Sequence, residues 1–254
     1  MSEPEAGRAT LPTDEIEWIR RTRRHPRPTQ PDYLVLRRLV EHVGAALARL
    51  GGGPLEVLDV FCGTRPYEDL MPAGSKVTGY DIDDRYGSAD VTGEEFLPFD
   101  DESFDLVFFA EGFFYSPDPG AAAAEMLRIA RPGGSTIVTL PLVWEYRADR
   151  LEHRFTAPEL ARVFERAGWS DVEAREVGGY AVSWSLLTGR IMRAVEESAR
   201  ARSRLGWRLR RLFAAAYVAM NAIAVLADRF ERRVWRPQPY VLPPDIILTA
   251  RRPR

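Results

Sequence analysis

The stretch EVLDVFCG (56–63) is a short apolar run that ends in a glycine turn. Apolar runs of this kind are typical of strands buried in a parallel sheet. Similar runs recur along the chain, as KVTGYDI (76–82), FDLVFFA (104–110), STIVTLP (135–141) and DIILTAR (245–251), and DVEAREV (171–177) is predicted as a further strand. We therefore predict a sheet of largely buried strands that begins at 56–61.

Amphipathic segments separate or precede these runs. One helix is predicted over 119–130, ended by the RPGG turn (131–134), and another begins at the capping box TAPE (156–159). Before the first strand, apolar residues at helical spacing predict a helix over 29–51 and a short one over 15–21. Strands that alternate with helices predict an α/β fold with a doubly wound, mostly parallel, Rossmann-like sheet. Such a sheet binds ligands at the carboxyl ends of its strands.

The strand and helix rhythm is interrupted late in the chain. We predict a helical cap over 1–50, a core over 51–182, a helical insert over 183–240 and the last core strand over 241–254. The sequence of the insert predicts two helices, over 183–202 and 209–233.

The second helix of the insert contains an uncharged stretch over 212–227, which is shorter than the roughly 20 residues that span a bilayer. We expect this stretch to be covered by the protein itself or by a second copy in a homodimer. Arginines on both sides keep a peripheral membrane contact through 205–233 as the alternative.

Composition narrows the function further. The net charge of −2 argues against a nucleic-acid-binding protein. A single cysteine, Cys62, and three widely spaced histidines predict no metal site. The first 15 residues lack an apolar signal core, which predicts a cytoplasmic location. Segment 81–120 is acidic and segment 190–254 basic, which is typical either of two solvated faces or of a cationic-ligand site and a separate docking surface.

The candidate ligand site lies after the first two strands. Asp81 follows Asp59 by 22 residues, the place where this fold type positions an acid on ribose hydroxyls. Gly63 lets the backbone approach a ligand closely. The loop lacks the GxGxxG pattern that binds a pyrophosphate, so a nucleoside without phosphates is favoured over a nicotinamide dinucleotide.

Several motifs in series resemble the class I S-adenosylmethionine (SAM)-dependent methyltransferases. They are VLDVFCG (57–63), LPFDDESFD (97–105), RIARPGG (128–134) and HRFTAPELARVFERAGW (153–169). The turn CGTRPY (62–67) also resembles a subgroup in which the second and third main strands are joined without a helix. The resemblance implies a seven-stranded sheet, SAM as cofactor and methyl transfer as the activity.

The resemblance also implies which residues bind the cofactor, all of them at or after strand ends. They are Asp59 and Gly63 at the methionine end, Asp81 at the ribose hydroxyls, Ile82 on the adenine, Glu94 or Asp90 near the adenine amino group, and Ala110 and Glu111 near the sulfonium. Phe61 stands where the family usually has a glycine, and we expect its side chain to narrow the pocket.

The acceptor side is less specified. His153 is our candidate general base and Tyr115 a candidate acceptor contact, although a surface role for His153 fits the sequence equally well. The N-terminal helices, with Trp18 and Tyr33, would form a lid. We expect a small-molecule acceptor methylated on oxygen or nitrogen. The alternative is a SAM-binding protein with a non-methylating role, such as a scaffold or a pericyclic catalyst.

Overall fold

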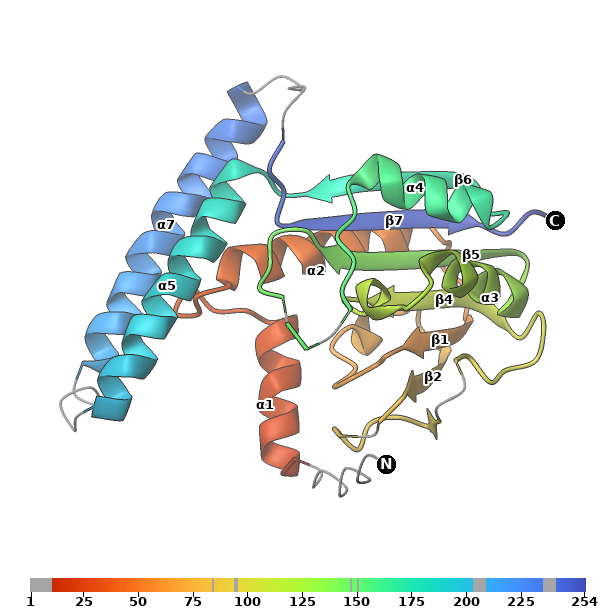
Figure 1. The fold of residues 1–254 in the computed structure, drawn as a ribbon, viewed down its shortest axis with the longest axis horizontal. Helices are drawn as coiled ribbons and strands as arrows, with labels where there is room; N and C mark the ends of the chain where they lie inside the picture. The colour runs from red at the N-terminus through yellow and green to blue at the C-terminus, as the bar shows by residue number, and fades with distance from the viewer. Residues whose placement is uncertain are drawn as a thin grey trace.

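The computed structural model describes residues 11–254, apart from 84, 94–95, 147, 150, 203–208, 235–240 and the side chain of Arg202. Its centre is one seven-stranded sheet (Figure 1). The strands are β1 (Glu56–Val60), β2 (Lys76–Asp81), β3 (Val91–Thr92), β4 (Phe104–Ala110), β5 (Ala130–Pro141), β6 (Ser170–Val177) and β7 (Asp245–Arg251). The predicted strands and the α/β class are therefore confirmed.

The order of the strands creates the ligand edge. The sheet runs β3-β2-β1-β4-β5-β7-β6, and only the pairings of β7 with β5 and β6 are antiparallel. The chain order reverses direction between β1 and β4, the switch point where open α/β sheets bind ligands. Among the described residues, no helix lies between β2 and β4, as the CGTRPY resemblance implied. The carboxyl ends of the parallel strands face helix α1 (Thr13–Arg24) in Figure 1.

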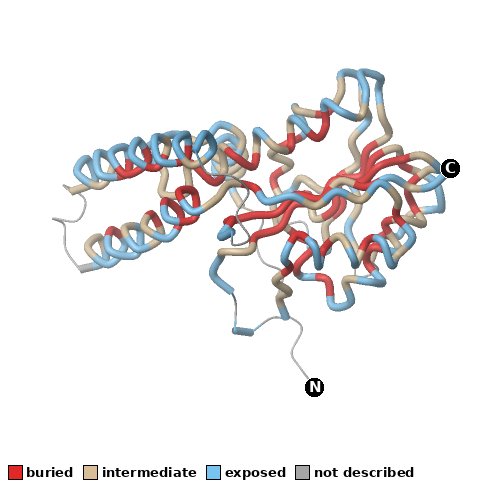
Figure 2. The backbone as a smooth tube through the Cα atoms, turned by 90° about the horizontal axis from the view of Figure 1, so that it is seen from above, coloured by how far each residue is buried: buried red, intermediate tan, exposed pale blue. Residues whose placement is uncertain are grey.

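Helices cover both faces of the sheet. Helix α2 (Tyr33–Ala48) packs on one face through Leu39, Val43 and Leu47. The opposite face is covered by α3 (Pro119–Ile129) and α4 (Ala157–Arg166). Figure 2 shows buried residues concentrated along the strands. These two apolar layers hold the strand ends in place, so that the site rests on rigid elements.

Three local predictions were wrong. Helix α2 begins at Tyr33, because residues 27–32 turn back on themselves and the Gln30 Oε1 accepts from the Arg27 backbone N–H at 2.5 Å. Strand β5 begins at Ala130, because Gly133 adopts a φ of 77° and pairs with Arg252 instead of ending the strand. Thr156 precedes α4 without a side-chain cap.

The insert forms two long helices, as predicted. Helices α5 (Tyr180–Arg202) and α7 (Arg210–Val234) pack on each other and stand at one end of the sheet (Figure 1). The expectation that the protein itself covers the uncharged stretch holds for one face only. Ile223 lies on the other face and is 60% exposed, because the polar residues of α7 turn toward the core instead. Of the segment 205–233, residues 205–208 lie outside the described residues.

Candidate cofactor and acceptor site

The turn after β1 is held by the end of β2. Phe61, Gly63 and Arg65 all have a φ between 51° and 53°, which gives the chain a tight left-handed course. Asp81 secures it, because its Oδ2 accepts from the Gly63 N–H at 3.2 Å and its Oδ1 from the Ile82 N–H at 2.9 Å. The two predicted strand-end residues, Gly63 and Asp81, thus lie in direct contact.

A cavity of about 120 Å³ lies at this edge of the sheet. Four of the predicted cofactor residues line it together, namely Asp59, Gly63, Ala110 and Glu111. Phe61 also lines the cavity, but its ring packs on Phe109 with 5.0 Å between the ring centroids. The ring thereby fills part of the core beside the cavity, and the close packing offsets the left-handed backbone at this residue.

Four acids lie at this edge of the sheet, of which Asp59 and Asp245 are buried and Asp81 and Glu111 half-buried. Burial raises the pKa of Asp59 well above its usual range, although the nearby Arg65 guanidinium acts in the opposite direction. Burial also raises the pKa of Asp81, while backbone N–H groups lower it. Burial raises the pKa of Glu111, although a hydrogen bond from Thr139 and the charge of Arg23 lower it. Burial also raises the pKa of Asp245 at the start of β7, and the Glu111 charge raises it further. A cationic ligand here would stabilise the ionised acids.

The residues that line this cavity can be compared with the needs of SAM, whose sulfonium is cationic. Glu111 Oε1 is buried, and among the described residues no group donates a hydrogen bond to it. An acid with unused acceptor capacity beside Asp59 suits a cationic cofactor. Burial and the neighbouring Asp59 raise the pKa of the Cys62 thiol, so this residue is not a thiolate nucleophile. The residues present therefore fit the cofactor that the resemblance implies.

The predicted adenine contacts are less closely gathered. Asp90 is engaged, because its Oδ2 accepts from the Arg65 Nη1 at 2.9 Å and from the Gly79 N–H at 2.8 Å. This position favours a role in fastening the turn to β2. Ile82 is 54% exposed next to Asp81, where it can cover a flat ring. Glu94 lies outside the described residues.

Helix α1 closes the cavity, a contribution that the sequence suggested only as a lid. Ile19 and Arg23 line the cavity, and the Arg20 Nε donates to the Thr64 carbonyl at 2.6 Å. Known ligand sites usually measure about 300–1,000 Å³. This cavity is far smaller, so with α1 in this position it has room for only part of a SAM molecule. Neither Ile19 nor Arg23 was predicted, because no motif marks them.

Tyr67 and Asp245 also belong to this edge and were missed. Tyr67 lines the cavity, and burial together with the charge of Glu111 raises the pKa of its phenol. It stands in the quoted CGTRPY turn, which could have drawn attention to it. Asp245 opens the last predicted strand, and nothing in its local pattern connects it with Glu111.

The two predicted acceptor residues lie together, outside this cavity. The His153 N–H donates to the Phe114 carbonyl at 2.9 Å, next to Tyr115, and the His153 ring stacks on Phe155. The His153 Nε2 is buried, and the described residues offer it no hydrogen-bond partner. Tyr115 is 38% exposed. Neither side chain lines the cofactor cavity, so their catalytic roles stay predictions.

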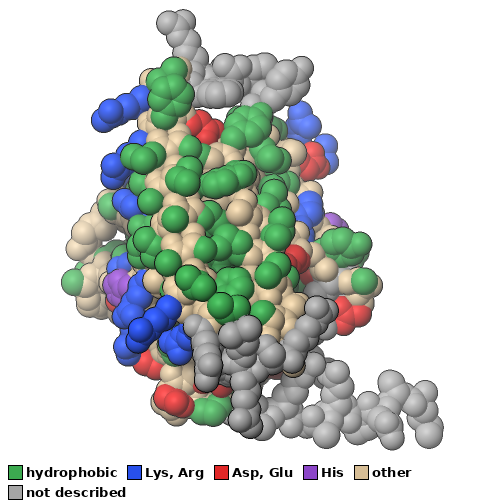
Figure 3. Space-filling model, turned by 90° about the vertical axis from the view of Figure 1, so that its left-hand side faces the viewer, with side chains coloured by type: hydrophobic (Ala, Val, Ile, Leu, Met, Phe, Trp, Pro, Cys, Tyr) green, Lys and Arg blue, Asp and Glu red, His purple; other side chains and the backbone are tan. Residues whose placement is uncertain are grey.

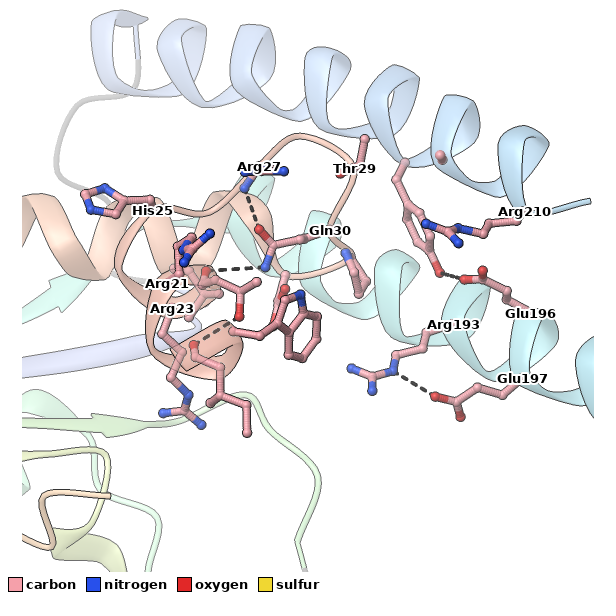
Figure 4. Close-up of a pocket in the computed structure, with 18 of the residues that line it drawn as sticks. Arg21, Arg23, His25, Arg27, Thr29, Gln30, Arg193, Glu196, Glu197 and Arg210 are labelled. Carbon is pink, nitrogen blue, oxygen red and sulfur yellow. Dashed lines mark hydrogen bonds and ion pairs between the residues drawn. The ribbon is translucent and has the colours of Figure 1, made fainter. Parts of the chain in front are cut away.

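A second cavity of about 740 Å³ lies between α1 and the α5–α7 pair (Figure 4). Figure 4 shows Arg21, Arg23 and Arg27 on one side, and Arg193 and Arg210 on the helices opposite. Arg193 pairs with Glu197 at 2.9 Å, and the Tyr217 hydroxyl donates to Glu196 at 3.1 Å. Ile19 and Arg23 line both cavities, so the two share a wall. This large cavity is the candidate acceptor site.

Comparisons with known proteins agree with this geometry. Residues 58–138, which run from the middle of β1 through most of β5, match a family model described as a methyltransferase domain. The chain is 28% identical to a demethylmenaquinone methyltransferase of Renibacterium salmoninarum, over 56% of this chain and 76% of that protein. A stretch of 39 residues is 51% identical to the uncharacterized protein Mb1440c of Mycobacterium bovis, but it spans only 15% of this chain and 14% of that protein.

Solved structures share the fold. The [4+2]-cyclase SpnF superposes with a TM-score of 0.53 at 18% identity, over 84% of this chain and 81% of that one. The phosphoethanolamine N-methyltransferase 2 of Haemonchus contortus, solved with S-adenosyl-L-methionine, gives a TM-score of 0.51 at 17% identity, over 84% and 53%. The domain match covers the strand ends that carry Asp59, Gly63, Asp81 and Glu111. Residues 58–138 therefore form a methyltransferase domain, as the resemblance to class I SAM-dependent methyltransferases implied, and this match supports S-adenosylmethionine as the cofactor.

Proposed function

We propose that this protein transfers a methyl group from SAM to an oxygen or nitrogen of a small molecule. The observation that carries the proposal is the pairing of Asp81 with the Gly63 turn, beside the buried Asp59 and the buried Oε1 of Glu111. This arrangement lies within the matched methyltransferase domain. The cytoplasmic location stays part of the proposal.

The predicted residues in and beside the cavity would each hold one part of the cofactor. Asp59 and the Gly63 backbone would bind the methionine end, and Asp81 would accept from the ribose hydroxyls. Glu111, whose Oε1 is buried without a donor among the described residues, would face the sulfonium region. Ile82 would cover the adenine, since its side chain is exposed beside Asp81.

The protein contributes to the reaction mainly by positioning the two reactants and by excluding water from them. When bound, SAM supplies an activated methyl group and its own leaving group. Correct alignment of two reactants accounts for about 7–11 kcal/mol of rate acceleration when the geometry is ideal. Helix α1 covers the cavity through Ile19 and Arg23 and is fastened by Arg20, which would keep water from the reacting atoms.

The acceptor would bind in the arginine-lined cavity. Arg23, Arg27 and Arg210 line it, and among the described residues no carboxylate forms an ion pair with them. Guanidinium groups favour an acceptor that carries a carboxylate, phosphate or other anionic group. One curated relative is named for demethylmenaquinone. By analogy with that relative, the acceptor of this chain would be a small organic molecule. His153 remains the candidate base for a hydroxyl acceptor, whereas an amine would need to arrive neutral.

Calorimetry with SAM tests the cofactor assignment. Asp81→Ala should weaken SAM binding by about 1.5–3 kcal/mol, the range for hydrogen bonds to a charged group, which corresponds to roughly 10-fold to 100-fold in Kd. Asp83→Ala is the matched control, because that side chain is 61% exposed and pairs only with Arg85 among the described residues. An unchanged Kd in Asp81→Ala would remove the assignment.

Incubation with labelled SAM and a bacterial metabolite extract tests the reaction itself. We expect label to appear in a small acidic product, and less of it with Asp81→Ala at low SAM concentration. Tight SAM binding with no label transferred would contradict the proposal. That result would favour the non-methylating role, a scaffold or a pericyclic catalyst.

A further inference from the structure

The α5–α7 pair exposes one continuous apolar face. It consists of Trp184, Leu187 and Ile191 of α5 and Ile223, Leu226 and Phe230 of α7, which we call the hairpin face. Ile191 is 67% exposed and Leu226 64%. Figure 3 looks onto this face and shows apolar side chains spread across both helices. A shallow groove lined by Trp184, Ile223 and Phe230 joins the two helices.

The outward direction of this face is fixed by polar contacts on the opposite side of α7. The Asn221 Nδ2 donates to the carbonyls of Pro28 at 2.8 Å and Gln30 at 2.9 Å. Asp228, only 2% exposed, forms an ion pair with Arg38 of α2. Rotating α7 to bury Ile223 would break these bonds and expose buried polar groups. The hairpin face therefore cannot be covered by the rest of the described chain.

The charge around the face is positive. The sequences of α5 and α7 hold nine arginines against four acids. Both acids of α7 are engaged, since Asp228 pairs with Arg38 and Glu231 accepts from the backbone N–H groups of Tyr180 and Ala181 at 3.0 Å.

The arginines border the apolar strip. Arg211 and Arg229 are exposed and lie 18 residues apart, which is five full helical turns, so they fall on one line along α7. Arg233 lies near this line and is exposed as well. Figure 3 shows basic side chains along the edges of the apolar face. An apolar strip bordered by arginines is the pattern of a helix that rests on anionic lipid.

We propose that the hairpin face docks on the surface of an anionic lipid bilayer, with α5 and α7 lying in the interface. Apolar side chains would enter the boundary between head groups and acyl chains, and the arginines would meet lipid phosphates. This docking does not depend on methyl transfer. A twofold contact between two copies is less favoured, because it would bring together two positively charged faces whose α7 acids are already engaged.

Insertion across the bilayer is also less favoured. By length and composition alone, α7 could cross a membrane, since it has 25 residues and a mean hydropathy of 1.4 over its most apolar window. However, crossing would separate Asp228 from Arg38 and Asn221 from its two carbonyl partners. The cost of leaving such groups unpaired in hydrocarbon favours a helix that lies on the surface.

Vesicle co-sedimentation of the full-length protein, without SAM, tests the proposal. We expect binding to vesicles of equimolar phosphatidylcholine and phosphatidylglycerol, weak binding to phosphatidylcholine alone, and release at high salt. The double variant Leu226→Glu/Phe230→Glu should bind these vesicles at least about tenfold more weakly. Leu151→Glu is its matched control, since Leu151 is 62% exposed outside the hairpin.

The arginines are tested separately. Arg229→Gln and Arg233→Gln should each weaken binding about fivefold, because one basic residue near an anionic surface contributes about 1 kcal/mol. Arg162→Gln on α4, whose side chain is 65% exposed, should change nothing. Melting curves of all variants should match the parent, because each replaced side chain is exposed.

Three results would overturn the proposal. Equal binding to both vesicle types would remove the anionic requirement. No binding, combined with a dimer in sedimentation equilibrium that Leu226→Glu/Phe230→Glu dissociates, would assign the face to a second copy. No binding by a protein that stays monomeric would show that the face is simply solvent-exposed. None of these results bears on labelled-methyl transfer, so failure here leaves the proposed activity standing.

Discussion

Replacing Arg38 by methionine should strongly destabilise the protein. Arg38 and Asp228 are separated by 190 residues, are 8% and 2% exposed, and form the ion pair that ties α7 to α2. Methionine keeps the length of the stem but removes the charge. Asp228 would then be a buried carboxylate that has lost its closest partner.

The magnitude follows from what remains around Asp228. Breaking a buried ion pair from one side usually costs about 3–5 kcal/mol. Arg232 lies 3.4 Å from the same Asp228 oxygen but has a side chain that is 58% exposed, so it offsets only a small part. We therefore expect a loss near the lower end, about 3 kcal/mol. For a chain of this size, this loss lowers Tm by roughly 6–12 °C.

Urea unfolding and thermal melting measure the loss, and Arg37→Met is the matched control. Arg37 is the neighbouring residue, pairs with Glu41 at 3.0 Å and has a side chain that is 40% exposed, so its loss should cost less than about 1 kcal/mol. The double variant Arg38→Met/Asp228→Leu should recover much of the stability, because it leaves no unpaired buried charge. If Arg38→Met cost no more than Arg37→Met, the claim that this pair anchors the hairpin would be wrong.

Two further predictions concern the strand-end acids and the acceptor side. Asp245→Asn should stabilise the protein at pH 8 more than at pH 5. Burial raises the pKa of Asp245 and Glu111 in the folded state, so the parent loses stability as pH rises through these values, by up to about 1.4 kcal/mol per pH unit for each proton. Urea unfolding at both pH values checks this, and an equal effect at both would contradict it. His153→Ala should lower turnover on a hydroxyl acceptor by about 10²–10⁴-fold with unchanged SAM affinity, and near-normal turnover would leave His153 a structural role.

The sequence predicted the main features of the sheet because they depend on local pattern. Continuous apolar runs are needed wherever a strand is covered on both faces, and FDLVFFA (104–110) meets that need. The contact between Gly63 and Asp81 was also predictable, since parallel neighbours bring their carboxyl ends together. Boundaries were less accurate: Gly133 continues β5, because its pairing with Arg252 depends on the far end of the chain.

Parts of the site that depend on distant partners could not be predicted. Asp245 opens a strand like any other, and it becomes notable only because β7 lies next to β5 and brings it near Glu111. The role of Arg23 was equally hard to predict, since one turn of an arginine-rich helix resembles the next. It lines both cavities because α1 crosses the ligand edge of the sheet, and neither spacing nor composition determines that crossing.

Helix α7 shows why an amphipathic pattern alone can mislead. The uncharged stretch over 212–227 is apolar on nearly every side, so periodicity does not say which side faces inward. Alanine and leucine fit either side, whereas a buried amide or carboxylate needs specific partners. Asn221 and Asp228 have such partners only on the side of α2 and of the loop before it. These two polar residues therefore select the inward face, and the larger apolar side chains, Ile223, Leu226 and Phe230, are left outward as a consequence.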